Sequence, residues 1–215
     1  RDNGKSNYNH DVKIIPLNIN LNSKIKYASY GIGIILSIFR YVKLLLKEKP
    51  DVSISFFADN NVVNVIASKI TSTKSIISLH SVPSNKLGVD RAYYYLRILG
   101  IYLGKFISRK IIVVSSGIGK ELLTNNKISP NKIELIYNPI DFLEISKLKT
   151  EVVNDNFFKT DEPILIFVGR LEEVKGLWHL IRVLYYINLK IRCRLVICGD
   201  GKQKNMLKGM VRELN

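Results

Sequence analysis

The sequence has few of the residues that form disulfides and metal sites. Two of its 215 residues are cysteine and three are histidine, and their spacing is not typical of a metal site. Cys193 and Cys198 lie in one apolar run at an odd separation, which in a strand places their side chains on opposite faces. We therefore expect no disulfide between them, no metal, and a reducing, cytoplasmic setting.

Long apolar runs are also missing. The longest stretch, from Tyr30 to Leu46, is interrupted by Arg40 and Lys43 and falls short of the about 20 apolar residues of a membrane-spanning helix. Its apolar positions recur at helical spacing, which predicts a helix packed on a sheet or, alternatively, one lying on a membrane. The first residues, Arg1 to Lys5, include neither an initiating Met nor the apolar core of a secretory signal, so we expect the natural start to lie upstream.

Acidic residues are scarce: 18 Asp and Glu stand against 33 Lys and Arg, for a net charge of +15. This excess favours phosphate-bearing partners such as nucleotides, anionic lipid or nucleic acid, although a compositional bias toward Lys, Ile and Asn explains it equally well. No helix-turn-helix, RNA-recognition or zinc-finger signature occurs, so we predict no nucleic-acid partner. No Gly-x-Gly-x-x-Gly follows a predicted strand, which argues against a dinucleotide-dependent oxidoreductase.

What the sequence does contain is an alternation of short β-branched runs and longer helical patterns, as in βαβ units. The predicted strands are Val12–Leu17, Val52–Phe57, Ser75–Leu79, Ile111–Val114, Ile133–Ile136, Ile164–Val168 and Arg194–Ile197. The predicted helices cover residues 30–47, 61–69, 90–107, 117–125 and 176–187, with one more after Gly201. Strands that are apolar throughout suit a parallel sheet covered on both faces, so the predicted class is α/β.

A polar segment divides this pattern in two. Pro139 ends regular structure, and residues 147–162 offer few candidates for a core. We predict a first domain over residues 1–146, a linker over 147–162 and the first part of a second domain over 163–215. Two strands do not complete a doubly wound sheet, so we expect the second domain to be incomplete.

The strongest chemical signal follows the strand at Ile164–Val168. Gly169, Arg170, Lys175 and Gly176 stand between this strand and the next predicted helix. Ligands of α/β folds bind at the carboxyl ends of strands, and a helix amino terminus attracts phosphate. Arg supplies a two-pronged donor and Lys a point charge, so together they suit a diphosphate. Taken alone, the two cations are equally compatible with an exposed, solvated loop.

This segment resembles the opening of the second domain in the family-4 glycosyltransferases of GT-B fold. Three further motifs follow the family's order: the strand ending in Gly199-Asp200-Gly201, the run Val113–Ser116, and the run Ile133–Asp141. The resemblance covers the chain from about residue 50 to its end. It implies two GT-B-like, Rossmann-like doubly wound parallel-sheet domains. It also implies transfer of a sugar from a nucleotide-diphosphate sugar to a polysaccharide or lipid-linked glycan, with retention of configuration and without a metal or cofactor.

The resemblance also implies roles for particular residues. Arg170 and Lys175, beside Gly169, would bind the donor diphosphate and stabilise the charge that grows on it. Gly199, Asp200 and Gly201 would lie near the nucleotide, where glycine permits close approach, although a plain strand-to-helix turn is the alternative. His80 follows a predicted strand and would lie beside the transferred sugar; the alternative is an ordinary loop histidine.

Two features of the family do not occur within these residues. No strand with a Gly-rich turn precedes Val12, and the family's paired glutamates would lie beyond Asn215. We therefore expect both domains to be incomplete and the segment to be inactive by itself. The alternative to a glycosyltransferase is a basic α/β protein that binds nucleic acid or an anionic membrane without catalysis.

The helix predicted over residues 90–107 combines aromatic and basic residues. These are Tyr93, Tyr94, Tyr95, Tyr102, Arg91, Arg97 and Lys105. Such a surface suits anionic lipid or a lipid-linked acceptor. The resemblance to the family implies a protein held peripherally on the inner face of the cell membrane. In the alternative, the helix buries Leu96, Leu99 and Leu103 and exposes the rest.

Overall fold

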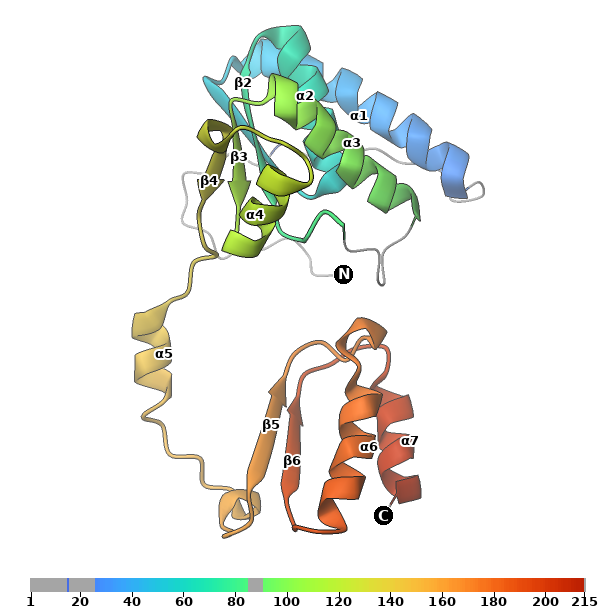
Figure 1. Cartoon of the computed structure of the whole chain (residues 1–215), viewed down its shortest axis with the longest axis vertical. Helices are drawn as coiled ribbons and strands as arrows, with labels where there is room; N and C mark the ends of the chain where they lie inside the picture. The colour runs from blue at the N-terminus through green and yellow to red at the C-terminus, as the bar shows by residue number, and fades with distance from the viewer. Residues whose placement is uncertain (1–14, 16–25, 85–90, 215) are drawn as a thin grey trace. The chain divides into compact units, whose positions relative to one another are not determined.

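The computed structural model describes residues 15, 26–84 and 91–214 (Figure 1). The chain forms two compact units, Arg1–Asn138 and Pro139–Asn215. The division falls between Asn138 and Pro139, so the short helix α5 (Phe142–Leu148) belongs to the second unit. The strand predicted at Val12–Leu17 lies, apart from Ile15, outside the described residues.

The first unit contains a four-stranded parallel sheet in the order β1-β2-β3-β4. The strands are β1 (Val52–Phe56), β2 (Lys74–Leu79), β3 (Lys110–Val113) and β4 (Ile133–Leu135). Each agrees within a residue or two with a strand predicted from the sequence. In β1, however, the buried side chains are Ser53 and Ser55, while Val52, Ile54 and Phe56 are exposed. Since every pairing is parallel, all four carboxyl ends lie at one edge of the sheet.

Helices α1 (Lys26–Glu48), α2 (Ala58–Thr71), α3 (Arg91–Ile107) and α4 (Ser116–Thr124) complete this unit. Helix α2 contacts both α1 and α3 (Figure 1), and it also packs on β1 and β2. Apolar side chains from the strands and helices bury together: Val65, Ile77, Leu79, Ile101, Ile111, Val113, Ile118, Leu122 and Ile128. This core holds the carboxyl edge of the sheet in place beside the starts of the helices.

A buried polar seam joins α2 to β1, where an apolar contact would be usual. The Asn64 Nδ2 donates to the Ser53 carbonyl (3.2 Å), the Ile76 carbonyl (3.1 Å) and the Ser55 hydroxyl (3.0 Å). The Ser53 hydroxyl in turn donates to the Asn64 Oδ1 at 2.6 Å. Because the Asn64 amide is matched on both its nitrogen and its oxygen, the seam sets the position of α2 on the sheet.

We expect Asn64→Ala to lower the free energy of unfolding by about 2–4 kcal/mol, because it leaves several buried polar groups without their partner. Urea unfolding of the complete protein measures this change. Asn60→Ala is the matched control, since Asn60 lies on the same helix but is exposed, and it should change stability by less than about 0.5 kcal/mol. Equal effects of the two substitutions would contradict a structural role for the seam.

The second unit pairs β5 (Ile164–Val168) with β6 (Arg194–Cys198) in parallel. Helices α6 (Leu177–Asn188) and α7 (Lys204–Leu214) lie side by side on one face of this sheet (Figure 1). Leu171, Leu177, Ile181 and Leu207 form its buried core. The predicted strand-helix order is confirmed here, and the sheet's role is to bring the carboxyl ends of β5 and β6 together.

Cys193 and Cys198 are both free, as predicted, with Cys193 half-buried and Cys198 exposed. None of the helices in the described part of the chain is long and apolar enough to cross a membrane.

Candidate active site

Two turns meet at the carboxyl ends of β5 and β6. The Gly169 N–H donates to the Cys198 carbonyl at 3.0 Å, and the Leu171 N–H donates to the Asp200 carbonyl at 2.9 Å. These bonds continue the strand pairing past the end of the sheet. The sequence-predicted residues Gly169, Arg170 and Gly199–Gly201 therefore belong to one local structure, although about thirty positions separate them in the chain.

Glycine at positions 199 and 201 has a packing reason. A Cβ at Gly199 would collide with the Gly169 carbonyl oxygen, and a Cβ at Gly201 would lie 2.5 Å from the Leu171 carbonyl oxygen. The two turns approach each other so closely that no side chain fits between them. From the sequence we expect these glycines to let the backbone approach a nucleotide closely. That role stays a prediction, and close packing of the two turns is a separate reason for glycine here.

Asp200 is committed to contacts within its own turn. Its Oδ1 accepts from the Gly201 N–H at 2.7 Å, and its Oδ2 accepts from the Lys204 Nζ at 2.8 Å. The Lys204 hydrogen bond, followed by that of the Gly201 N–H, holds the pKa of Asp200 below its usual value. The carboxylate therefore stays charged at neutral pH, and its stabilising contribution is lost as the pH falls through that lowered pKa.

Arg170 and Lys175 lie in the connection between β5 and α6. Both are exposed, and no carboxylate of the described residues lies within 4.0 Å of either cation. Lys175 ends a single 3₁₀ turn (Glu173–Lys175), and Gly176 then takes the left-handed φ of 62° that starts α6. Two uncompensated cations thus lie in the connection that leads to α6, with Lys175 directly before Gly176, and a helix amino terminus is a favourable place for phosphate.

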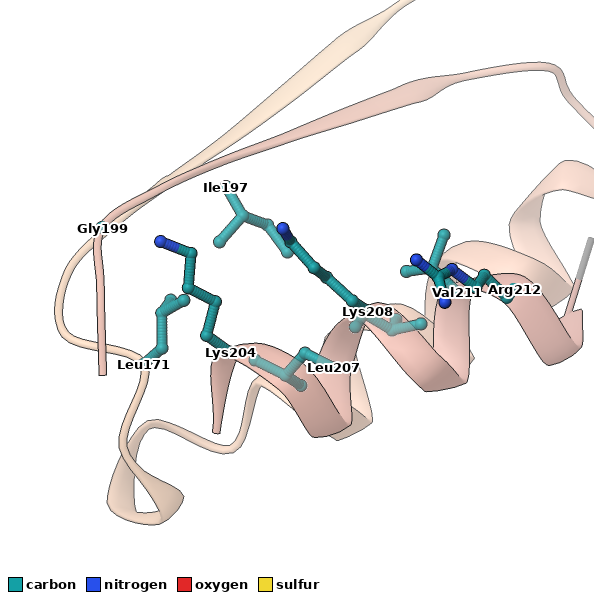
Figure 2. A pocket seen from close by; sticks show the side chains of 9 residues that line it. Leu171, Ile197, Gly199, Lys204, Leu207, Lys208, Val211 and Arg212 are labelled. Atoms are coloured by element: carbon teal, nitrogen blue, oxygen red, sulfur yellow. The ribbon is translucent and has the colours of Figure 1, made fainter. Parts of the chain in front are cut away.

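A hollow of about 420 Å³ adjoins the glycine turn, and Gly199 is part of its lining. Figure 2 shows Lys204 and Lys208 reaching from α7 toward Gly199 and Ile197. Leu171 and Leu207 supply apolar lining, and neither Arg170 nor Lys175 is part of the wall. Sequence reasoning missed this row of cations on α7, which the four-residue spacing of Lys204, Lys208 and Arg212 signals.

In the first unit, His80 follows β2 at the carboxyl edge of the sheet, where the sequence placed it. Its Nε2 lies 3.1 Å from the Ser78 hydroxyl. The ring centroid lies 5.7 Å from that of Phe56 and 6.3 Å from that of Phe57. These contacts orient the imidazole while it remains exposed to solvent.

Phe57, between β1 and α2, has a φ of 71°. A bulky residue in this left-handed region is strained, and such strain is concentrated at ligand sites, where surrounding structure enforces it. The carboxyl edge of this sheet therefore has a second mark of a functional site beside His80.

The structure corrects the predicted basic face of α3. Arg97 is 4% exposed, and its Nη1 donates to the Ser81 hydroxyl at 3.1 Å. The Tyr93 hydroxyl accepts from the Ala58 N–H at 3.3 Å. Both residues face inward because they lie one turn apart on the side of α3 that packs on α2. The exposed apolar row of α3 is instead Tyr95, Leu99, Tyr102 and Phe106.

Metal ligation has no candidate among the described residues. Over 26–84 and 91–214, no three His, Cys, Asp or Glu side chains gather in a way that would hold an ion. The expectation that the chemistry needs no metal stays a prediction.

Each of the two units has a parallel sheet and helices, and solved structures that the chain resembles are GT-B glycosyltransferases, so the class of protein is GT-B, with Rossmann-like halves. The crystal structure of Anabaena HepE in complex with UDP and glucose matches at a TM-score of 0.60 and 17% identity, over 82% of this chain and 48% of that one. Residues 7–142 match the model of Glycosyltransferase Family 4, and residues 149–215 match that of Glycosyl transferases group 1. The chain belongs to glycosyltransferase family 4.

Two relatives are similar in sequence. A glycosyltransferase of Methanocaldococcus jannaschii is 30% identical over 192 residues, which are 82% of this chain and 46% of the relative. The N-acetylgalactosamine-N,N'-diacetylbacillosaminyl-diphospho-undecaprenol 4-alpha-N-acetylgalactosaminyltransferase of Campylobacter jejuni is 36% identical over 107 residues, 49% of this chain and 27% of that protein. The chain spans about half the length of the first relative and about a quarter of the second.

Proposed function

We propose that the protein transfers a sugar from a nucleotide-diphosphate sugar to a polysaccharide or lipid-linked glycan acceptor. The observation that carries the proposal is the pair of exposed cations, Arg170 and Lys175, between the carboxyl end of β5 and the start of α6. The UDP and glucose in Anabaena HepE support this choice of donor. The diphospho-undecaprenol in the name of the Campylobacter jejuni relative supports a lipid-linked acceptor.

The chemistry follows from where charge accumulates. When the bond between sugar and diphosphate breaks, the leaving oxygen gains negative charge. The Arg170 guanidinium binds two oxygens at once and the Lys175 ammonium adds a point charge, so both stabilise the leaving group with no reorganisation at the moment of reaction. Gly169 and Gly199–Gly201 hold the turns in place beside the nucleotide. His80 hydrogen-bonds the transferred sugar, and the anomeric configuration is retained.

The direct test is a transfer assay on the complete protein with a panel of nucleotide sugars and a lipid-linked acceptor. We expect turnover with at least one donor, and release of the corresponding nucleoside diphosphate. Calorimetry with the nucleoside diphosphate alone supplies a second measurement, since the product retains the phosphates that the cations bind. Absence of both binding and turnover over the panel would contradict the proposal.

The proposed location is the inner face of the cell membrane. The row Tyr95, Leu99, Tyr102 and Phe106 leaves large apolar side chains exposed along α3, with fractions from 42% to 64%. Exposed Arg91 and Arg109 lie at the two ends of this helix. Aromatic side chains flanked by cations suit the interface of an anionic bilayer.

Vesicle sedimentation tests this location. We expect the complete protein to bind vesicles that contain phosphatidylglycerol, and binding to weaken when salt is raised, because the cations contribute by charge. Tyr102→Asp should reduce vesicle binding about tenfold or more, since it places a negative charge near the anionic lipid and removes apolar contact. Val183→Asp, at an exposed apolar position of the second unit, is the control. Equal binding by the two variants would argue against α3 as the contact surface.

A further inference from the structure

A second hollow, of about 270 Å³, lies at the carboxyl edge of the first unit. Three segments line it: the turn from β1 into α2, the residues at the end of β2, and the inward face of α3. The side chains that matter for the argument are His80, Ser81, Tyr93 and Arg97. Of these four residues, the proposed transfer involves only His80, and Ser81, Tyr93 and Arg97 have no role in it.

Arg97 brings a permanent positive charge to this hollow, because a guanidinium stays protonated at every physiological pH. The residue is 4% exposed, so water screens its charge poorly. Its Nη1 donates to the Ser81 hydroxyl, and its guanidinium lies 5.4 Å from the centroid of the Tyr94 ring. The side chain is therefore held in one orientation against the wall of the hollow.

Two hydroxyl groups add neutral donors. Ser81 accepts its bond from Arg97, and Tyr93 accepts its bond from the Ala58 N–H. A hydroxyl that accepts in this way still has its own hydrogen to donate. Among the described residues that line the hollow, none has a carboxylate. The lining thus combines a buried cation with hydroxyl donors, which suits an anion with several acceptor oxygens.

The size of the hollow limits what it takes in. Sites that enclose a whole drug-sized ligand measure about 300–1,000 Å³, so a volume of about 270 Å³ fits one group of a larger molecule. His80 is exposed beside this hollow and leaves room for the rest of that molecule.

We propose that this hollow binds a phosphate group of the acceptor, with Arg97 as the charged ligand and Ser81 and Tyr93 as neutral donors. That the phosphate belongs to an acceptor rests on the proposed sugar transfer. The binding of phosphate itself does not rest on it.

The test uses the complete protein with Arg170→Ala and Lys175→Ala, which removes the cations proposed for the donor. Inorganic phosphate is titrated in and binding is measured by calorimetry, with acetate as a second probe. We expect saturable binding of phosphate, weaker binding of acetate, and a loss of affinity of about tenfold or more in Arg97→Met. Ser81→Ala and Tyr93→Phe should each weaken binding several-fold. Lys69→Ala, which removes an exposed cation in the last turn of α2, should leave it unchanged.

Circular dichroism shows whether Arg97→Met folds. If it does not, Arg97→Lys and Ser81→Ala decide the question, because the first keeps a positive charge at position 97 and the second leaves Arg97 itself in place. Unchanged phosphate affinity in folded Arg97 variants, or equal binding of acetate, would overturn the proposal.

Transfer assays separate this proposal from the proposed function. In protein with native Arg170 and Lys175, Arg97→Lys should raise KM for a phosphate-bearing acceptor and leave KM for the nucleotide sugar unchanged. If transfer occurs and Arg97→Lys leaves the acceptor KM unchanged, the proposed phosphate site is wrong and the proposed function stands. Phosphate binding at Arg97 without any transfer would defeat the proposed function alone.

Discussion

Arg170→Ala should lower kcat for sugar transfer by about 10²–10³-fold, as expected when a preorganised donor to a developing anion is removed. Because the diphosphate is already charged in the bound donor, part of the loss should also raise the donor KM. Lys175→Ala should act in the same direction. The kcat of Arg170→Lys should lie between those of Arg170→Ala and the native protein, since lysine keeps the charge but loses the two-pronged geometry.

Steady-state kinetics of the complete protein with varied nucleotide sugar measure both parameters. Lys190→Ala is the matched control: it removes an exposed cation of the same unit just past the far end of α6. The melting temperature should be unchanged in all variants, because the side chains of Arg170 and Lys175 are exposed. If Arg170→Ala turned over as fast as Lys190→Ala, the assigned stabilisation of the leaving group would be wrong.

Gly199→Ala should destabilise the second unit by on the order of 3 kcal/mol, as severe overpacking does. The added Cβ would occupy the space of the Gly169 carbonyl oxygen. The carboxyl ends of β5 and β6 must then separate, which breaks the bonds from Gly169 to Cys198 and from Leu171 to Asp200. Because the turn that holds Arg170 moves with them, affinity for the nucleoside diphosphate should also fall.

Gly209→Ala provides the control for this substitution. Gly209 lies within α7, and a Cβ there meets nothing within 4 Å. Since alanine favours a helix interior over glycine, this variant should gain about 0.5–1 kcal/mol. Thermal and urea unfolding of the complete protein compare the two. A Gly199→Ala protein as stable as the native one would refute the close approach of the turns.

The six strands of the described residues were predictable from the sequence, because each coincides with a short run rich in apolar residues between residues that interrupt it. The predicted strand Ile164–Val168 has the same bounds in the structure, and α6 differs from its prediction by one residue at each end. Helix α1 begins at Lys26, four residues before its predicted start at Tyr30, since helix ends depend on local contacts that apolar spacing does not report.

The candidate site was predictable in part. The positions of His80 and Arg170 after their strands follow from the rule that ligands bind at carboxyl ends of parallel strands. The inward position of Arg97 did not follow, because the residues around it on α3 are aromatic or apolar in nearly every direction. A helical pattern without a clear polar side leaves the rotation of the helix undetermined. Contact with α2 decided it.

The sequence by itself determined the order of the described strands and helices and the cations that follow β5, since these depend on neighbouring residues along the chain. The tertiary structure alone decided which side chains meet. Gly199 faces the Gly169 carbonyl, and Arg97 reaches Ser81, through contacts between segments far apart in the chain. Such contacts depend on strand register and helix rotation, which only packing of the whole core can set.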